Sequence, residues 1–272
     1  MQLREETIGI LGAGNIGTAI ARGIVAAKLI APERVIMTRR QPRHLDRYAE
    51  ERFRITSDNL AAVKEATLLI LAVTPQQLNA LLAEIGPALE PGRHTVVSVV
   101  SGASIAEIQS RVSPTVTVIR AMPNTAIAIG ESMTCIAAGK DQAGPLAMVK
   151  EMFEALGRVV VIKEELMVPA TALCACGIAF FLRAIRAASQ GGIEIGFHAE
   201  DALLMAAQTA RGAASLIAEG GNHPEREVDK VTTPQGCTIS GLNQMEHNGF
   251  SSAMIKGIVT AAEKAAMLYA PK

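Results

Sequence analysis

The sequence has few aromatic residues and no net charge. Among its 272 residues tryptophan is absent, aromatic residues make up 3%, and 26 lysines and arginines balance 26 aspartates and glutamates. With no basic surplus and few aromatic rings on which bases could stack, neither nucleic acid nor an anionic membrane is expected as a partner. With 49% hydrophobic residues, the chain has ample material for a core. We therefore expect a globular protein that acts on a small molecule.

Cysteines are also few, and their spacing indicates neither a metal site nor a disulfide framework. They are Cys135, Cys174, Cys176 and Cys237. None forms a Cys-x-x-Cys pair, and in a helix Cys174 and Cys176 would lie about 200° apart around the axis, unable to converge on one metal. The five histidines show no metal spacing. We predict no metal, and reduced thiols that fill apolar space.

Nothing in the sequence favours a membrane protein. The polar segment 1–6 leads directly into a strand, which predicts no signal peptide and a cytoplasmic location. The run Leu166–Leu182 holds 17 uncharged residues but contains Pro169 and is followed by Arg183. This run favours a helix buried on several faces, as at a subunit interface.

The chain divides by pattern into two parts. Short β-branched runs alternate with helical stretches up to residue 162, which is typical of βαβ units and a mainly parallel sheet. The expected strands are Thr7–Leu11, Arg34–Thr38, Leu68–Val73, Thr95–Val100, Val116–Arg120, Met133–Ala138 and Val159–Ile162. The helices expected thereafter are Pro169–Gln190, Ala199–Glu219, Glu225–Val231, Thr238–Asn248 and Ser251–Leu268. We predict an α/β fold, with a Rossmann-like dinucleotide-binding domain over 1–162 and an all-helical dimerisation domain over 163–272.

A glycine motif follows the first expected strand. Gly12-Ala13-Gly14-Asn15-Ile16-Gly17 reads Gly-x-Gly-x-x-Gly between a strand and a helix. In this context the first glycine permits a tight turn, the second lets the backbone approach a pyrophosphate, and the third permits close packing of helix on strand. The motif predicts a bound dinucleotide.

The end of the second strand favours NADPH over NADH. An NAD site places an acid there for the ribose 2′-hydroxyl, whereas this chain has Thr38, Arg39 and Arg40. Guanidinium groups suit a 2′-phosphate, to which they can bind in bidentate fashion. Two further strand ends, Leu71–Pro75 and Ser98–Gly102, come to the same carboxyl edge of the sheet, where ligands of such folds bind.

Four motifs together resemble pyrroline-5-carboxylate reductase over nearly the whole chain. They are Gly12–Gly17, Ala72-Val73-Thr74-Pro75-Gln76, Ala121-Met122-Pro123-Asn124-Thr125 and Thr233-Pro234-Gln235-Gly236-Cys237-Thr238. The resemblance implies reduction of the cyclic imine pyrroline-5-carboxylate to L-proline with NAD(P)H, by a homodimer that can assemble further.

The resemblance also assigns site residues. It implies dinucleotide contacts from Gly12 to Gly17 and at Thr38, Arg40, Asn59, Ala72, Val73, Thr74, Pro75, Val99, Val100 and Ser101. It implies substrate contacts at Met122, Asn124, Cys176, Gly236, Cys237 and Thr238. The last three would begin a helix whose N–H groups hold the substrate carboxylate, and such a terminus is a ready anion site.

The sequence departs from the family pattern in two places. Family members usually read Ser-Gly-Ser-Gly-Pro-Ala-Tyr where this chain has Cys174-Ala175-Cys176-Gly177-Ile178-Ala179-Phe180. They usually read Pro-Gly-Gly where this chain has Pro234-Gln235-Gly236. The first departure replaces hydroxyls by thiols and removes a tyrosine hydroxyl, while the second keeps Gly236 and Thr238.

Thr238 is the candidate catalytic residue, because its hydroxyl could hydrogen-bond the imine nitrogen that must gain a proton. A purely structural alternative is that Thr238 caps the helix. Two other functions stay open. One is a related NADP-dependent reductase of another small imine or hydroxy acid. An example, a β-hydroxyacid dehydrogenase, would carry a lysine on a central helix, and the expected helix Pro169–Gln190 has none. The other is a non-catalytic NADP-binding sensor.

Overall fold

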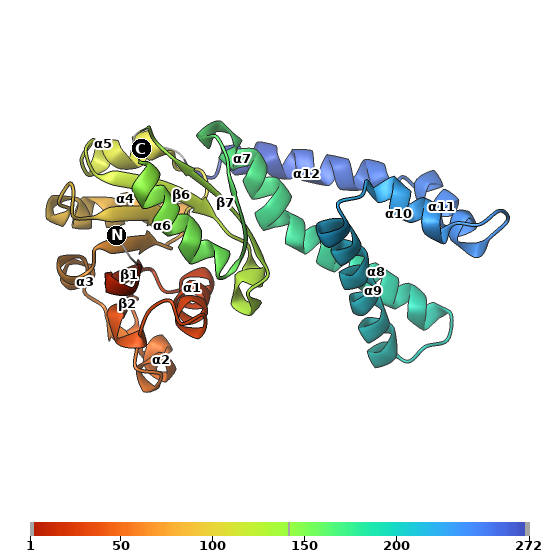
Figure 1. Cartoon of the computed structure of the whole chain (residues 1–272), viewed down its shortest axis with the longest axis horizontal. Coiled ribbons are helices and arrows are strands. Elements are labelled where there is room, and N and C mark those ends of the chain that lie inside the picture. Colours follow the sequence, from red (N-terminus) through yellow and green to blue (C-terminus); the bar gives the residue numbers. More distant parts are fainter. Residues whose placement is uncertain (1–2, 141, 270–272) are drawn as a thin grey trace. The chain divides into compact units, whose positions relative to one another are not determined.

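The computed structural model describes residues 3–140 and 142–269 and consists of two compact units (Figure 1). One contains the chain up to Cys176 together with the segment from Ala261 onward, and the other comprises Gly177–Thr260. The first unit holds every strand among the described residues, and the second is helical. The predicted fold class, a Rossmann-like domain followed by a helical domain, is confirmed.

Eight strands form one sheet in the order β3-β2-β1-β4-β5-β6-β7-β8. The strands are β1 (Ile8–Leu11), β2 (Val35–Thr38), β3 (Arg54–Thr56), β4 (Leu68–Leu71), β5 (Thr95–Ser98), β6 (Thr117–Met122), β7 (Ser132–Ala138) and β8 (Gly157–Val161). All neighbours are parallel except β6 and β7, which are antiparallel. Strand β3 was not predicted, because its three residues are too few for a recognisable alternation.

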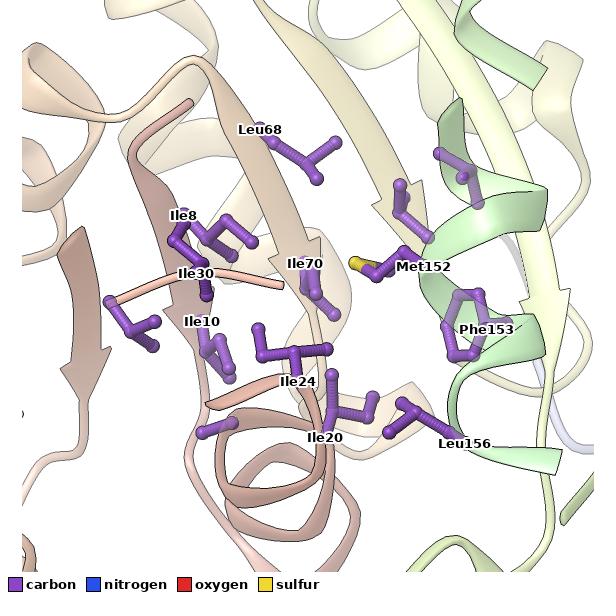
Figure 2. Close-up of a cluster of buried hydrophobic side chains, with 14 of the residues drawn as sticks. Ile8, Ile10, Ile20, Ile24, Ile30, Leu68, Ile70, Met152, Phe153 and Leu156 are labelled. Atoms are coloured by element: carbon purple, nitrogen blue, oxygen red, sulfur yellow. The ribbon is translucent and has the colours of Figure 1, made fainter. Parts of the chain in front are cut away.

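Side chains alternate between the two faces of the sheet, and both faces are apolar. Helices therefore cover both faces. The helices of this unit are α1 (Asn15–Ala26), α2 (Asp46–Glu50), α3 (Asn59–Glu65), α4 (Pro75–Ile85), α5 (Ile105–Arg111), α6 (Ala143–Glu154) and α7 (Met167–Ala170). On one face Ile8 and Ile10 pack against Ile20 of α1, with Phe153 of α6 in the same cluster (Figure 2). On the other face, the neighbouring strand positions pack against α3, α4 and α5.

The second unit consists of helices with little buried surface. After the π-helical segment η7 (Thr171–Cys176) come α8 (Gly177–Glu194), α9 (Ala199–Gly220), α10 (Pro224–Val231), α11 (Cys237–His247) and α12 (Phe250–Ala266). Among its described residues only Gly177, Ser189 and Ala202 are buried. A single copy of this unit therefore has no hydrophobic core of its own.

One helical stretch of the described residues, Glu164–Glu194, is long and apolar enough to cross a membrane by length and composition. Leu173, Phe181 and Leu182 on it are more than half exposed.

The division between the units differs from the predicted boundary after residue 162. Met167 and Ala170 are buried against Met122 and Cys135, so that the segment after β8 stays with the sheet. The chain end returns to the same unit, where the Tyr269 hydroxyl donates to Asn79 Oδ1 at 2.6 Å. These contacts join residues far apart in the sequence, and no local pattern reveals them.

Candidate functional site

The glycine loop between β1 and α1 shows a separate reason for each glycine. Gly12 has φ +93°, and a Cβ there would lie 2.5 Å from Val73 Cγ1. A Cβ on Gly17 would lie 3.0 Å from both Gly12 O and Ile10 Cγ2, so Gly17 lets α1 pack closely on β1. A Cβ on Gly14 would meet nothing within 4 Å, although Gly14 is the N-cap of α1. The open space beside Gly14 fits a pyrophosphate at the helix N-terminus.

A cavity of about 500 Å³ opens beside this loop at the carboxyl edge of the sheet. It is lined by Gly12, Gly14, Thr38, Arg39, Arg40, Gln41, His44, Ser57, Asn59, Ala72, Val73, Thr74, Gln77, Ala80, Leu81 and Glu84. The strand ends of β1, β2 and β4 thus converge as their parallel pairing requires.

Nine predicted cofactor residues line this cavity, namely Gly12, Gly14, Thr38, Arg39, Arg40, Asn59, Ala72, Val73 and Thr74. The other predicted cofactor residues, Ala13, Asn15, Ile16, Gly17, Pro75, Val99, Val100 and Ser101, do not line it. Ala13 is fully buried, and its N–H donates to Thr38 O at 2.8 Å. Ala13 therefore holds the loop against β2.

A hydrogen-bond chain fixes the polar wall of the cavity. Both oxygens of the Glu84 carboxylate accept from the Asn59 amide, at 3.2 and 3.0 Å. The Asn59 carbonyl oxygen is thereby turned toward Thr38, whose hydroxyl donates to it at 2.6 Å. The Thr38 oxygen accepts in turn from the Gly12 N–H at 3.3 Å. Glu84 thus orients Asn59, and Thr38 ties β2 to the glycine loop.

The two arginines after β2 differ in their contacts. Arg39 Nη1 donates to Ala13 O at 3.5 Å. The exposed side chain of Arg40 makes no hydrogen bond or ion pair with any residue that the structure describes. Arg40 is therefore the guanidinium left available to an anionic group in the cavity.

Seven residues that line the cavity were not predicted. They are Gln41, His44, Ser57, Gln77, Ala80, Leu81 and Glu84. The last four recur every three to four residues on α4, so one face of this helix borders the cavity. Because α4 begins at the β4 strand end, this periodicity was a usable signal.

Other predicted residues lie at or after the ends of β5 and β6, outside the cavity. The Val99 N–H donates to Leu71 O at 3.1 Å, and the Ser101 hydroxyl contacts Met122 Sδ at 3.9 Å. Met122 and Asn124 are buried at the end of β6. The Asn124 amide donates to the backbone oxygen of Cys174 at 3.3 Å, which connects this edge to η7.

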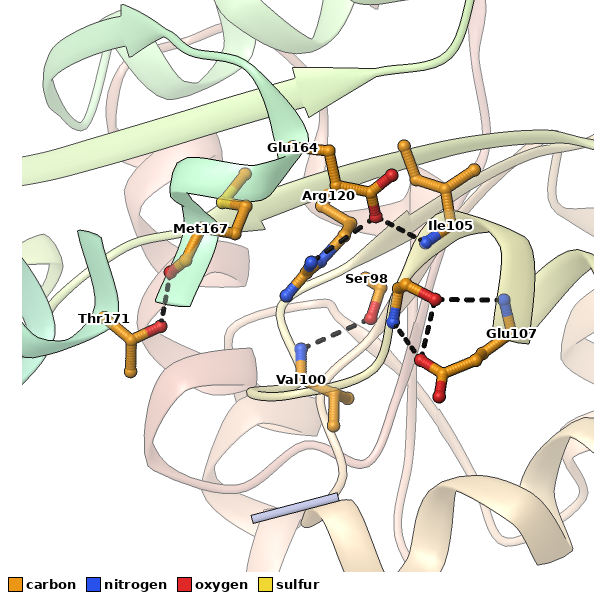
Figure 3. Close-up of polar contacts among 9 residues, drawn as sticks. Ser98, Val100, Ile105, Glu107, Arg120, Glu164, Met167 and Thr171 are labelled. Carbon is orange, nitrogen blue, oxygen red and sulfur yellow. Dashed lines mark hydrogen bonds and ion pairs between the residues drawn. The ribbon is translucent and has the colours of Figure 1, made fainter. Parts of the chain in front are cut away.

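A buried ion pair supports the same edge (Figure 3). Arg120 of β6 is 4% exposed, and its Nη1 lies 3.4 Å from Glu164 Oε1. The same oxygen accepts from the Ile105 N–H at the start of α5, at 2.6 Å. Burial lowers the pKa of Arg120, and the Glu164 carboxylate opposes that shift. Glu164 therefore joins β6, α5 and the segment that leads to α7.

The predicted substrate residues fall in both units. Met122, Asn124 and the half-buried Cys176 belong to the first unit, whereas Gly236, Cys237 and Thr238 belong to the second. The helix α11 begins at Cys237 with Gly236 as its N-cap, so Thr238 is its second residue. The structural alternative, in which Thr238 caps the helix, is therefore wrong. The Thr238 hydroxyl makes no hydrogen bond within the described part of the chain.

The turn before α11 explains one departure from the family pattern. Gln235 has φ +61°, a left-handed conformation that glycine adopts freely and other residues do not. The next position requires glycine, because a Cβ on Gly236 would lie 2.4 Å from Thr233 Oγ1. The chain thus forms this turn with backbone strain at Gln235.

Comparisons with known proteins agree with this architecture. A family model for pyrroline-5-carboxylate reductase dimerisation matches residues 164–268, and one described as NADP oxidoreductase coenzyme F420-dependent matches residues 7–102. A similar solved structure is that of pyrroline carboxylate reductase from Plasmodium falciparum with NADP bound, at 23% identity and a TM-score of 0.89 over 98% of this chain and 99% of that one. The structure of a pyrroline-5-carboxylate reductase from Coxiella burnetii is 25% identical, with a TM-score of 0.88 over 98% of this chain and 99% of that one.

Two relatives from Dictyostelium discoideum are more similar in sequence. Pyrroline-5-carboxylate reductase 1 is 51% identical over all of this chain, which spans about half (51%) of that protein's length. Pyrroline-5-carboxylate reductase 2 is 48% identical over 96% of this chain and 92% of its own length. The predicted resemblance is confirmed, and the chain belongs to the pyrroline-5-carboxylate reductase family.

Proposed function

We propose that this protein reduces L-1-pyrroline-5-carboxylate to L-proline with NADPH. The observation that carries the proposal is the cavity beside the open Gly14 position, with Arg39 and Arg40 on its wall, in a chain of this family. In the reaction the C=N bond of the imine becomes a single bond, as a hydride reaches the carbon and a proton the nitrogen. The cofactor supplies the hydride from its nicotinamide ring.

The first unit binds and orients the cofactor. The N–H groups in the first turn of α1 have no partner within the helix and would hold the phosphates. Arg40, with Arg39 as an alternative donor, would pair with the 2′-phosphate, which would give the preference for NADPH over NADH. The hydrogen bonds among Thr38, Asn59 and Glu84 hold these side chains in place before the cofactor binds. Binding therefore loses little side-chain entropy at this wall.

The start of α11 binds the substrate. Its first N–H groups, including those of Cys237 and Thr238, lack partners within the helix and carry the positive end of the helix dipole. They hold the carboxylate of the imine. The free hydroxyl of Thr238 donates to the imine nitrogen and stabilises the amine that forms there, with water as the proton source.

The helical unit forms the dimer through its exposed apolar faces. A groove of about 250 Å³ runs between α8 and α12, lined by Phe180, Arg183, Ala184, Ala187, Phe250, Ala253, Met254 and Gly257. Ile195, Leu204 and Ile255 are 78%, 69% and 61% exposed in a single copy. Such a surface is unstable in water, and a second copy of the unit covers it. The same contact buries the exposed Phe181 and Leu182 of α8, in a cytoplasmic protein.

A turnover assay tests the proposal. Purified protein with pyrroline-5-carboxylate and NADPH should consume the imine and NADPH in equal amounts and release proline. NADPH binding without turnover would favour the non-catalytic sensor, and turnover only with a hydroxy or keto acid would favour the dehydrogenase. Light scattering should show a dimer or a multiple of it at micromolar concentration, and an active monomer would contradict the interface.

A further inference from the structure

Two cysteines that are distant in the sequence meet in the first unit. Cys135 lies on β7 and Cys174 on the π-helical segment η7, and their sulfur atoms are 3.9 Å apart. Both thiols are free. The prediction that the cysteines merely fill apolar space did not foresee this contact, because 38 residues separate the two along the chain. Neither Cys176 nor Cys237 has a sulfur partner among the described residues.

The two thiols differ in their access to solvent. Cys135 is 6% exposed and belongs to a small apolar cluster with Met122 and Met167, whereas Cys174 packs at the edge of that cluster and is half-buried. A small oxidant can therefore reach Cys174, and Cys135 lies behind it.

The contact also changes the acidity of the pair. The hydrogen bond from Cys135 lowers the pKa of Cys174 to about 7, although burial opposes this shift. The same hydrogen bond, followed by burial, raises the pKa of Cys135. At neutral pH Cys174 is thus partly thiolate, the nucleophilic form, while Cys135 keeps its proton.

We propose that Cys174 and Cys135 form a reversible redox site that is oxidised by hydroperoxides. The Cys174 sulfur attacks hydrogen peroxide, the O–O bond breaks, and a sulfenic acid forms with release of one water. The Cys135 sulfur then attacks the Cys174 sulfur, the S–O bond breaks, and the departing hydroxide takes the Cys135 proton as a second water. Two thiols lose two electrons in total, and one peroxide becomes two waters.

The disulfide would act on the edge of the sheet where Asn124 lies. A disulfide bond is about 2.05 Å long, so the sulfurs must approach each other by about 1.9 Å. This movement pulls η7 toward β7 and disturbs the hydrogen bond from Asn124 to the Cys174 backbone oxygen. We expect the oxidised protein to keep its affinity for NADPH, because the 500 Å³ cavity is lined by other residues. Its turnover should fall about tenfold or more, since small misplacements near a reacting centre are costly.

The chemistry can be tested without any activity. The full-length reduced protein is treated with hydrogen peroxide, digested without reduction and analysed by mass spectrometry. The expected product is a peptide pair joined through Cys135 and Cys174 that has lost two hydrogen atoms, with monomer mobility in non-reducing electrophoresis and full reversal by dithiothreitol. Its rate of formation should rise as the pH passes through about 7, as the Cys174 thiolate forms.

Variants separate the two roles. Cys135→Ala should stop at the sulfenic acid of Cys174, which dimedone traps, while Cys174→Ala should form neither product. Cys176→Ala and Cys237→Ala keep the pair and should give the same Cys135–Cys174 crosslink as the unaltered protein. Dimedone labelling spread evenly over the four thiols, or no Cys135–Cys174 crosslink, would overturn the proposal.

The effect on turnover rests on the proposed function, and the crosslink does not. A protein that forms the crosslink but never reduces the imine would refute the reductase and leave the redox site standing. A reductase that forms no crosslink would refute the redox site alone.

Discussion

Substitution of Gly14 by alanine should weaken cofactor binding while leaving the fold intact. Gly14 has φ −87° and ψ −155°, which alanine adopts without strain, and the added Cβ would meet nothing within 4 Å. The free energy of unfolding should therefore change by less than about 0.5 kcal/mol. The added methyl group would instead occupy the space where a pyrophosphate approaches the backbone.

The magnitude follows from the contacts that the methyl group displaces. A hydrogen bond from a backbone N–H to a charged group contributes about 1.5–3 kcal/mol. Loss of one such bond raises Kd by about ten- to a hundredfold. The dissociation constant for NADPH can be measured by titration of NADPH fluorescence, and stability by thermal or urea unfolding of the protein without cofactor.

Gly12→Ala is the matched comparison. At φ +93° an alanine costs about 1–2 kcal/mol, and its Cβ would in addition lie 2.5 Å from Val73 Cγ1 and 3.0 Å from the Ala72 backbone. This variant should lose more than about 2 kcal/mol of stability. If Gly14→Ala binds NADPH normally, or is destabilised as much as Gly12→Ala, the assignment of the open space beside Gly14 to the pyrophosphate is wrong.

Substitutions at four further positions test other parts of the structure. Arg40→Asp should raise the KM for NADPH about ten- to a hundredfold and leave that for NADH nearly unchanged, because it replaces a phosphate partner by a like charge; an unaltered ratio of the two KM values would contradict the assignment. Thr238→Ala should lower kcat about ten- to a thousandfold with unchanged NADPH affinity, as for loss of one positioned donor, while Thr238→Ser retains much of the activity. Normal turnover of the alanine variant would refute the catalytic role of Thr238. Gln235→Gly relieves a left-handed φ of 61° but also gives the unfolded chain more conformational freedom. The free energy of unfolding should therefore rise by up to about 1 kcal/mol. A fall in this free energy, measured by urea unfolding, would be inconsistent with strain at Gln235. Glu164→Ala should lower the free energy of unfolding by about 3 kcal/mol, since it leaves the buried Arg120 without its carboxylate partner. Glu164→Gln should lower it by less, because an acceptor oxygen remains. If both variants are as stable as the unaltered protein, the ion pair contributes nothing to stability.

The sequence by itself determined the features that depend on neighbouring residues. Strands and helices follow from the period of the hydrophobic residues, and the parallel sheet follows from their alternation. Gly12 and Gly17 stand where a turn and a helix contact require glycine, and Gly14 stands beside open space. The ends of parallel strands share one edge of the sheet, so the sequence also predicted that Thr38 and Ala72 belong to one site, and both line the cavity.

Only the tertiary structure decided which distant groups meet. Glu84 reaches Asn59 because α4 lies beside α3, and Cys135 reaches Cys174 because η7 folds back onto β7. The segment 163–176 stays with the sheet through Met167, although its composition resembles that of the helices that follow. Such contacts arise from packing in three dimensions, and the free energy that selects them comes from burial of surfaces far apart in the chain.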